Sequence, residues 1–342
     1  MTWSKKSWTT WKFRNPFRGG GDASVADLPT WDDFETEDPV AVLKRVRHLE
    51  IRTRRLVDQI FSGEYHSIFR GQGMEFHDVR PYVAGDDVRA IDWNVTARAA
   101  EPYVKTFVET RELVVLLMAD LSASTLFGTG GKAKRDLLAE TAALLIFSAI
   151  RNRDQVGLVL FTDRLEKVIL PRKGRRHGLR LLRELLEFRP EGRGSDLSQP
   201  LEQVARLLRR RAVVFLMSDF LFPDPTDALR RVAGRHDLIP VVMSDQREEV
   251  LPPVGLVELE DLETGRRRLV DTSNAGVRKL FEERGRHRRE VLSHIFGRTG
   301  LDAVWLETEK DPAAALQHLF KVRLKRRSSG GIVAGPNVGA RS

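Results

Sequence analysis

Three runs of consecutive apolar residues, 113–119, 212–217 and 238–243, most constrain how this chain can fold. A strand covered on both faces reads as a continuous apolar run, whereas a half-exposed strand alternates. Segments with the helical spacing of apolar residues surround these runs, at 132–151, 175–187, 199–210, 274–296 and 311–319. Further strands are predicted at 156–161, 167–170 and 303–306, with a hairpin over 258–270. This alternation predicts an α/β fold with a doubly wound, mostly parallel sheet of Rossmann type.

The two ends of the chain differ in composition from the middle. Residues 1–39 hold a basic block, three glycines and then an acidic block, so we expect a disordered arm. Residues 40–111 are expected to form a smaller N-terminal segment, in which a helix begins at Pro39 and is followed by short strands and a short helix over 88–93. We expect the α/β domain over 112–320, and a disordered tail over the basic, Gly- and Ser-rich residues 321–342.

The composition excludes several classes of protein. The 342 residues include no cysteine, which excludes disulfides, thiolate metal sites and cysteine nucleophiles. No apolar run reaches the ~18 residues that a membrane span needs. Charged residues near the N-terminus stand where a secretory signal would have its apolar core. We therefore expect a cytoplasmic protein without a transmembrane segment.

The charge leaves nucleic acid open as an alternative partner. The net charge is +9, and arginine-rich runs occur at 172–177, 209–211 and 266–268. However, 48 acidic residues are interspersed with 57 basic ones, and no nucleic-acid-binding fold signature accompanies the runs. Basic residues at helix ends also commonly interact with the helix dipole. Specific nucleic-acid binding is therefore the weaker alternative.

Oxygen-bearing side chains follow two of the predicted buried strands. Asp120 ends the first strand, and Ser122 and Ser124 alternate with it, so an extended segment would point all three in one direction. Asp219 lies just beyond the run 212–217, and Ser195 offers a further hydroxyl in a glycine-containing loop. Because parallel strands end at one edge of a sheet, the two carboxylates should meet there and repel unless a cation lies between them. This set, without histidine or cysteine, suits Mg²⁺, with Mn²⁺ or Ca²⁺ as alternatives.

Other interpretations use the same residues. Asp and Ser after a strand often only cap the next helix. A metal-dependent hydrolase or phosphatase would need an acid or base close to Asp120, and the position two residues on is Ser122, which exchanges protons poorly. The glycine-rich residues 128–133 lack the first glycine and the final hydroxyl of a phosphate-binding loop. We therefore expect a binding protein rather than an enzyme, with the hydrolase as the alternative function.

The pattern Asp-x-Ser-x-Ser, a hydroxyl loop and a later Asp resembles the metal-ion-dependent adhesion site of von Willebrand factor A domains. The resemblance implies a von Willebrand factor A-like fold and five metal ligands: Asp120, Ser122, Ser124, Ser195 and Asp219. Ser195 stands where that family usually has threonine. The hydroxyl is kept, but the methyl group that restrains its rotamer is lost.

An upstream signature is similar to that of domain of unknown function family 58. It comprises Gly71–Phe76, Asp78–Tyr82, Gly85–Trp93, Ala97–Arg98 and Val104–Lys105. The resemblance implies a metal-dependent adaptor that grips a partner carboxylate and works with a MoxR-type AAA+ ATPase. For Asp86, Asp87, Arg89, Asp92 and Arg98, we favour an ion-paired scaffold that fastens this segment to the sheet over a direct functional role.

Overall fold

The computed structural model describes most of the chain. The described residues are 11–14, 39–60, 75–84, 86–88, 91–99, 101–108, 112–129, 131–192, 194–222, 224–262 and 266–329. Both the expected arm and the expected tail therefore fall largely outside this part of the chain. Within it, no helix is long and apolar enough to cross a membrane.

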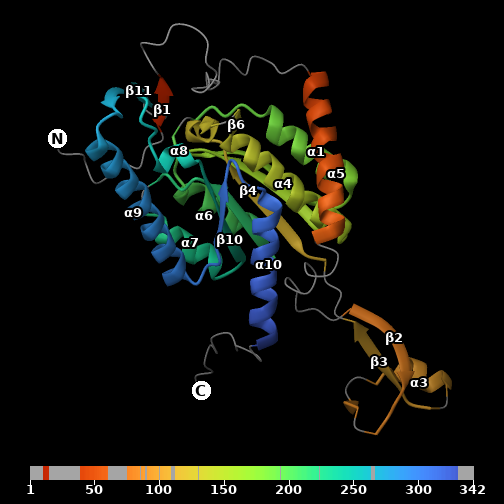
Figure 1. Ribbon diagram of the computed structural model, residues 1–342. Helices are drawn as coiled ribbons and strands as arrows, with labels where there is room; N and C mark the ends of the chain where they lie inside the picture. The colour runs from red at the N-terminus through yellow and green to blue at the C-terminus, as the bar shows by residue number, and fades with distance from the viewer. Residues whose placement is uncertain are drawn as a thin grey trace.

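A six-stranded sheet forms the centre of the molecule (Figure 1). Its strands are β4 (Val114–Asp120), β7 (Gln155–Phe161), β8 (Leu165–Arg172), β9 (Val213–Ser218), β10 (Asp237–Ser244) and β13 (Val304–Glu307). They lie in the order β13-β10-β9-β4-β7-β8, and every neighbouring pair is parallel except β7 and β8. The prediction of a doubly wound, mostly parallel sheet is confirmed.

Helices cover both faces of this sheet. One face packs against α1 (Pro39–Ile60), α4 (Lys134–Arg151), α5 (Arg175–Glu187) and α10 (Pro312–Ser329), and the other against α6 (Ser198–Leu207), α7 (Thr226–Ala233) and α9 (Ala275–Thr299). Neighbouring residues of each central strand enter opposite cores: Leu117 of β4 lies in the first and Leu116 in the second. Burial on both faces is why these strands are apolar throughout.

The remaining elements are short. They are η2 (Ala123–Leu126), β5 (Gly128–Thr129), β6 (Lys132–Ala133), α8 (Gln246–Glu249), β11 (Leu256–Asp261), β12 (Arg267–Asp271), β2 (Glu75–Pro81), α3 (Trp93–Ala99), β3 (Tyr103–Val108) and β1 (Trp11–Arg14). β11 and β12 form the predicted hairpin, whose tip at 263–265 lies outside the described residues.

The structure describes a short part of each predicted end. Within the arm 1–39, which was expected to be disordered, β1 pairs antiparallel with β11, because the edge of that hairpin offers free backbone groups. The last helix was expected to end at 319, and the tail to begin at 321, yet α10 continues to Ser329. Arg323 on this extension bonds Asp302 at 3.0 Å and Asp237 at 2.9 Å, which fixes the basic stretch on the domain.

The N-terminal segment 40–111 divides into two parts. The buried side of α1 joins the sheet core through Val42, Val46 and Leu49. The β2–β3 hairpin with α3 stands apart from the sheet in Figure 1. α3 begins at Trp93, because the Asp92 carboxylate accepts the backbone N–H of Asn94 at 3.0 Å and caps the helix there. The short helix expected over 88–93 includes residues 89 and 90, which lie outside the described residues.

Candidate metal centre

Asp120 and Asp219 come together where the order of the sheet reverses. β4 and β9 are adjacent and parallel, with Ala119 opposite Met217, so both chains leave the sheet at the same edge. The chain continues from β4 to β7 on one side and later returns to β9 on the other. Crevices at such switch points are the usual ligand sites of doubly wound sheets.

Asp120 is fully buried and bonded only by neutral donors. The backbone N–H of Ser122 donates to one carboxylate oxygen at 2.9 Å, and the Ser218 hydroxyl donates to the other at 2.6 Å. Burial, and next the negative charge of Asp219, raise the pKa of Asp120 to about 6, against the lowering effect of these hydrogen bonds. Ionisation of Asp120 in the folded protein therefore costs free energy, and a bound cation would offset that cost.

Two hydroxyl groups stand beside the carboxylates. Ser122 and Ser124 are both buried, and their Oγ atoms lie 3.0 Å apart. The Ser124 hydroxyl also bonds Asp219 and helps to lower the pKa of that carboxyl. The expected extended segment is not what brings them together: the chain turns into η2 from Ala123, and the backbone carbonyl of Ser122 accepts the N–H and hydroxyl of Thr125 at 3.0 and 2.7 Å.

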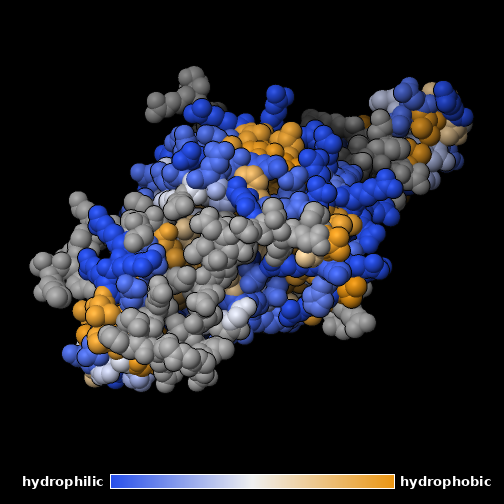
Figure 2. All heavy atoms as spheres, turned by 90° about the horizontal axis from the view of Figure 1, so that it is seen from above, coloured by the Kyte–Doolittle hydropathy of each residue, from blue (hydrophilic) through white to orange (hydrophobic). Residues whose placement is uncertain are grey.

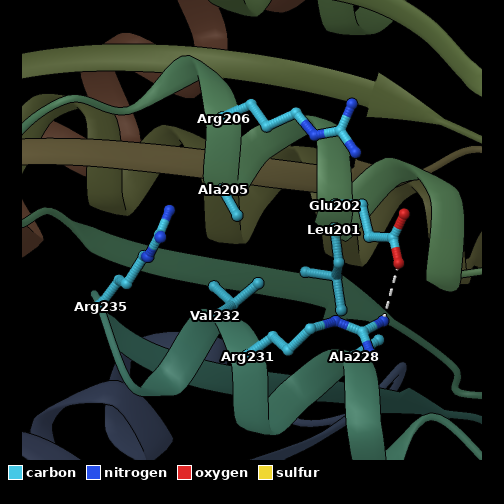
Figure 3. Close-up of a pocket in the computed structure, with 8 residues that line it drawn as sticks. All are labelled: Leu201, Glu202, Ala205, Arg206, Ala228, Arg231, Val232 and Arg235. Carbon is cyan, nitrogen blue, oxygen red and sulfur yellow. Dashed lines mark hydrogen bonds and ion pairs between the residues drawn. The ribbon is translucent and has the colours of Figure 1, made fainter.

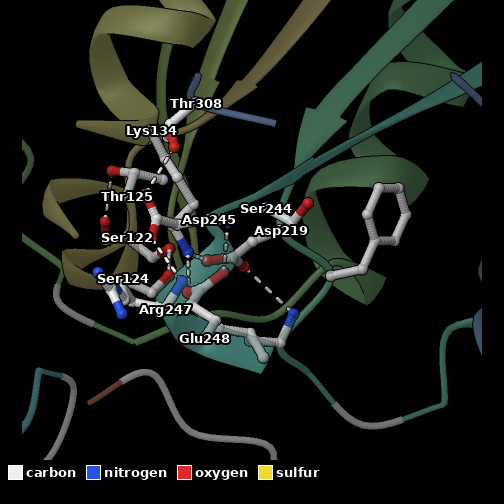
Figure 4. A network of polar contacts seen from close by, with 12 residues as sticks. Ser122, Ser124, Thr125, Lys134, Asp219, Ser244, Asp245, Arg247, Glu248 and Thr308 are labelled. Carbon is white, nitrogen blue, oxygen red and sulfur yellow. Dashed lines mark hydrogen bonds and ion pairs between the residues drawn. The ribbon is translucent and has the colours of Figure 1, made fainter. Parts of the chain in front are cut away.

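A buried lysine that sequence reasoning missed reaches the same cluster (Figure 4). The Lys134 Nζ, at the start of α4, donates to Asp219 at 2.6 Å and to Glu248 of α8 at 2.6 Å. Lys134 and Asp219 are fully buried, and only 4% of the Glu248 side chain is exposed. Burial opposes charge on both partners, but the ion pairs outweigh it, raising the pKa of Lys134 and lowering that of Asp219.

Asp245, at the end of β10, fixes the surrounding loops. Its carboxylate accepts the hydroxyl of Thr308 at 2.6 Å, the backbone N–H of Thr129 at 3.0 Å and that of Arg247 at 2.9 Å. Its own backbone N–H donates to Glu248 at 3.2 Å. Asp245 therefore joins the segments that follow β4, β10 and β13 by hydrogen bonds. These bonds hold Glu248 in position to pair with Lys134.

Ser195 lies in a loop at the same edge of the sheet, and no hydrogen bond joins it to the other four predicted ligands in the described part of the chain. Its loop lies against the turn after β7, where the N–H of Gly192 donates to Glu166 at 2.8 Å and that of Asp196 to the carbonyl of Thr162 at 3.4 Å. β7 is the neighbour of β4 in the sheet. Among the described residues, the buried Ser195 Oγ has no hydrogen-bond partner, so it is an unsatisfied oxygen at this edge.

These donors fit a hard divalent cation. All five predicted side chains offer oxygen, and an unpartnered hydroxyl together with a destabilised carboxylate are what a cation would satisfy. In the described part of the chain, no three His, Cys, Asp or Glu residues are grouped as metal ligands. A cation here would therefore depend on the serines as well as on the two aspartates.

The upstream signature has a structural role that is visible in part. Arg80 and Asp86 form a two-fold hydrogen-bonded ion pair at 2.7 and 2.6 Å, and Asp86 also accepts the N–H of Val83 at 3.0 Å. This pair lies within the β2–β3 unit, so it stabilises the unit itself rather than fastening it to the sheet. Arg89 lies outside the described residues.

Comparison with known proteins gives one relative over most of the chain and another over part of it. "Uncharacterized protein Rv1480" of Mycobacterium tuberculosis is 32% identical over 291 residues, covering 84% of this chain and 91% of that protein. "Uncharacterized protein MAV169" of Mycobacterium avium is 30% identical over 162 residues, covering 46% of this chain and 95% of that protein. Among solved structures, BatB from Bacteroides thetaiotaomicron is 13% identical with a TM-score of 0.42, covering 62% of this chain and 99% of that one.

A family model also matches directly. The model described as "Protein of unknown function DUF58" matches residues 78–291, which include part of the upstream signature and the residues Asp120 to Asp219 of the candidate centre. That span is more than half of the chain. The protein therefore belongs to the DUF58 family.

Proposed function

We propose that this protein is a metal-dependent protein-binding adaptor rather than an enzyme. The observation that carries the proposal is the state of Asp120, a buried carboxylate with neutral donors only and with the charge of Asp219 close by. Buried carboxylates are normally paired with a cation or protonated. A divalent ion between the two strand ends would supply the missing positive charge.

The ligand set follows from the residues at this edge. Ser122, Ser124 and Ser195 would hold Mg²⁺, or Mn²⁺ or Ca²⁺ in its place, through their hydroxyl oxygens. Asp120 and Asp219 would balance its charge directly or through water. The bound ion would supply an acceptor for one further oxygen ligand, a carboxylate from a partner protein. Asp219, the carboxylate whose charge acts on Asp120, is paired with Lys134 and has a lowered pKa, so it is a poor proton donor and a weak base; binding is therefore favoured over hydrolysis.

The cation is tested by unfolding the protein in chelator and in millimolar Mg²⁺ or Mn²⁺. A bound ion raises the melting temperature by mass action. Asp120→Asn should abolish this rise and, in chelator, should raise the melting temperature, because it removes a buried charge while keeping the side chain's shape. Asp227→Ala, at an aspartate whose side chain is 85% exposed, is the control and should respond as the wild type does.

The two effects of Asp120→Asn distinguish a metal ligand from a structural carboxylate. A merely structural aspartate would lower the melting temperature when replaced, with or without metal. A wild-type melting temperature that does not change with metal would contradict the proposal. Turnover of a phosphate ester in the presence of metal, lost in Asp120→Ala, would contradict the adaptor interpretation in favour of hydrolysis.

The partner that the family resemblance points to is a MoxR-type AAA+ ATPase or its client. Asp120, Ser122, Ser124 and Asp219 are all buried, so a partner carboxylate reaches the ion only after a neighbouring loop moves. We therefore expect association slower than the usual lower limit of about 10⁵ M⁻¹s⁻¹. Pull-down of a purified ATPase of this class with metal, and its loss in chelator or with Asp120→Asn, tests the pairing.

A further inference from the structure

A groove on the opposite side of the sheet from α1 and α4 is separate from the candidate metal centre (Figure 3). It lies between α6 and α7 and encloses about 320 Å³, near the lower end of the range for ligand pockets. Its lining shares no residue with the metal centre. What occupies it is therefore a question that the proposed function does not answer.

The floor of the groove is apolar. Leu201 and Ala205 line it from α6, and Ala228 and Val232 line it from α7. Leu201, Ala228 and Val232 belong to the second hydrophobic core, so the floor is the outer surface of that core. These small and branched side chains leave space between the two helices, and an apolar side chain that filled it would be removed from water.

The rim is basic. Arg206 from α6, and Arg231 and Arg235 from the end of α7, border the groove, and Glu202 is the only acidic residue among those that line it. Glu202 is already paired with Arg231 at 2.9 Å. Arg206 and Arg235 form no ion pair within the described residues, and both are exposed.

Further arginines continue the basic rim beyond α6. Arg209, Arg210 and Arg211 follow the helix and are exposed. Burial lowers the pKa of His236, and the nearby charges of Arg235 and Arg211 lower it further. Interaction with the helix dipole accounts for a single arginine at a helix end. It does not explain why arginines from both helices border one open apolar groove.

We propose that this groove binds an acidic, amphipathic peptide segment of a partner protein. One or two apolar side chains of the segment would lie on the floor, and flanking carboxylates would pair with Arg206 and Arg235, whose guanidinium groups favour two-fold hydrogen bonds to carboxylate. Nucleic acid is the less suitable occupant, because none of the residues that line the groove has an aromatic ring on which bases could stack.

A display library of random peptides about a dozen residues long, the usual size of helix-in-groove ligands, identifies the sequence that the groove selects. The full chain is the bait, in chelator so that the metal centre takes no part. We expect recovered peptides to combine Asp or Glu with Leu, Ile or Phe. Their affinities should fall at least ten-fold with Arg206→Glu, Arg235→Glu or Ala205→Trp, the last of which fills the groove.

Arg176→Glu is the matched control. Arg176 is an exposed arginine on α5, on the other face of the sheet, so it changes the charge equally without touching the groove. Recovered peptides that lack acidic residues, or that bind the three groove variants as tightly as the wild type, would overturn the proposal. So would a single-stranded or duplex oligonucleotide that displaces the peptides at ~0.15 M salt, where nonspecific contacts with phosphate are weakened. Circular dichroism of each variant checks that it is folded.

Discussion

Lys134→Met tests whether the buried ion pairs hold the candidate metal centre together when no metal is supplied. Methionine keeps most of the length of the side chain and removes the ammonium group that lies 2.6 Å from both Asp219 and Glu248. Each pair has a Coulomb attraction of about 6 kcal/mol at this distance and an effective dielectric constant of 20. Much of that attraction only offsets desolvation, and breaking a buried pair from one side typically costs about 3–5 kcal/mol.

The variant is therefore expected to unfold about 6–20 °C below the wild type in chelator, since 1 kcal/mol corresponds to about 2–4 °C in a domain of this size. Replacing Asp219 by Asn in the same variant should recover part of the loss, because one of the two carboxylates that lost the lysine is then neutral. Mg²⁺ should stabilise Lys134→Met more than the wild type, because the ion then supplies the positive charge that the lysine supplied.

Lys132→Met is the matched control for this experiment. Lys132 lies two residues earlier and bonds Glu140 at 2.7 Å, but 28% of its side chain is exposed. A partly exposed pair of this kind contributes about 1 kcal/mol or less. The reasoning is refuted if the two lysine variants have the same stability, or if Lys134→Met lies within about 1 kcal/mol of the wild type in urea unfolding.

Three further predictions concern single side chains. Burial raises the pKa of Asp154 to about 7. Because this pKa is higher in the folded than in the unfolded protein, the stability of the wild type should fall as the pH rises from about 4 to about 7. Asp154→Asn should flatten that fall in unfolding curves measured across this range. Ser195→Ala removes an unpartnered hydroxyl, so it should leave the melting temperature in chelator unchanged or higher while weakening the response to Mg²⁺; an unaltered Mg²⁺ titration would exclude Ser195 as a ligand. Gly157→Ala would place a methyl group 2.9 Å from backbone atoms of β8 and should cost about 1–3 kcal/mol, whereas Gly297→Ala, in open space on α9, should stabilise by about 0.5–1 kcal/mol in the same urea titration.

The meeting of Asp120 and Asp219 could be predicted because it follows from sheet geometry. Asp120 stands directly after one apolar run and Asp219 two residues after another, and parallel strands covered by helices end at one edge. The runs themselves identify the central strands, so neither step needed a knowledge of side-chain contacts. The contact between the Ser122 and Ser124 hydroxyls was expected for a different reason, an extended chain, and the turn at η2 produces it instead.

Lys134 could not be predicted in the same way. Lysine near a helix start is ordinarily a solvated residue, and its partners Asp219 and Glu248 are 85 and 114 positions away in sequence. No local period links them. The only local signal was the lysine's place just after a glycine-rich turn, at the start of the helix that follows the Asp120 loop. Long-range ion pairs of this kind depend on how loops fold over the sheet edge.

The packing of α1 also depends on tertiary contacts that the sequence pattern does not reveal. Its helical period was evident, and its buried face is the one that the period predicts, yet Val42, Val46 and Leu49 join the core under α4. Nothing in the spacing says which apolar surface a helix will cover. The eight-residue helix α7 was not predicted, because it is short. Its buried Leu229 and Val232 span a single helical turn, which is too little to reveal a helical period.

The helices that border the basic groove begin at the loops that carry candidate metal ligands. α6 follows the loop of Ser195, and α7 follows the loop of Asp219. A partner that placed a carboxylate on the ion and an acidic segment in the groove would therefore be held at two places on one rigid layer. The second contact of such a partner is intramolecular. Loss of either site alone should therefore raise the dissociation constant of the partner by the ratio of the effective concentration to the dissociation constant of the lost site. If either chelator or Arg206→Glu leaves the binding of one partner unchanged, the groove and the metal centre serve different partners.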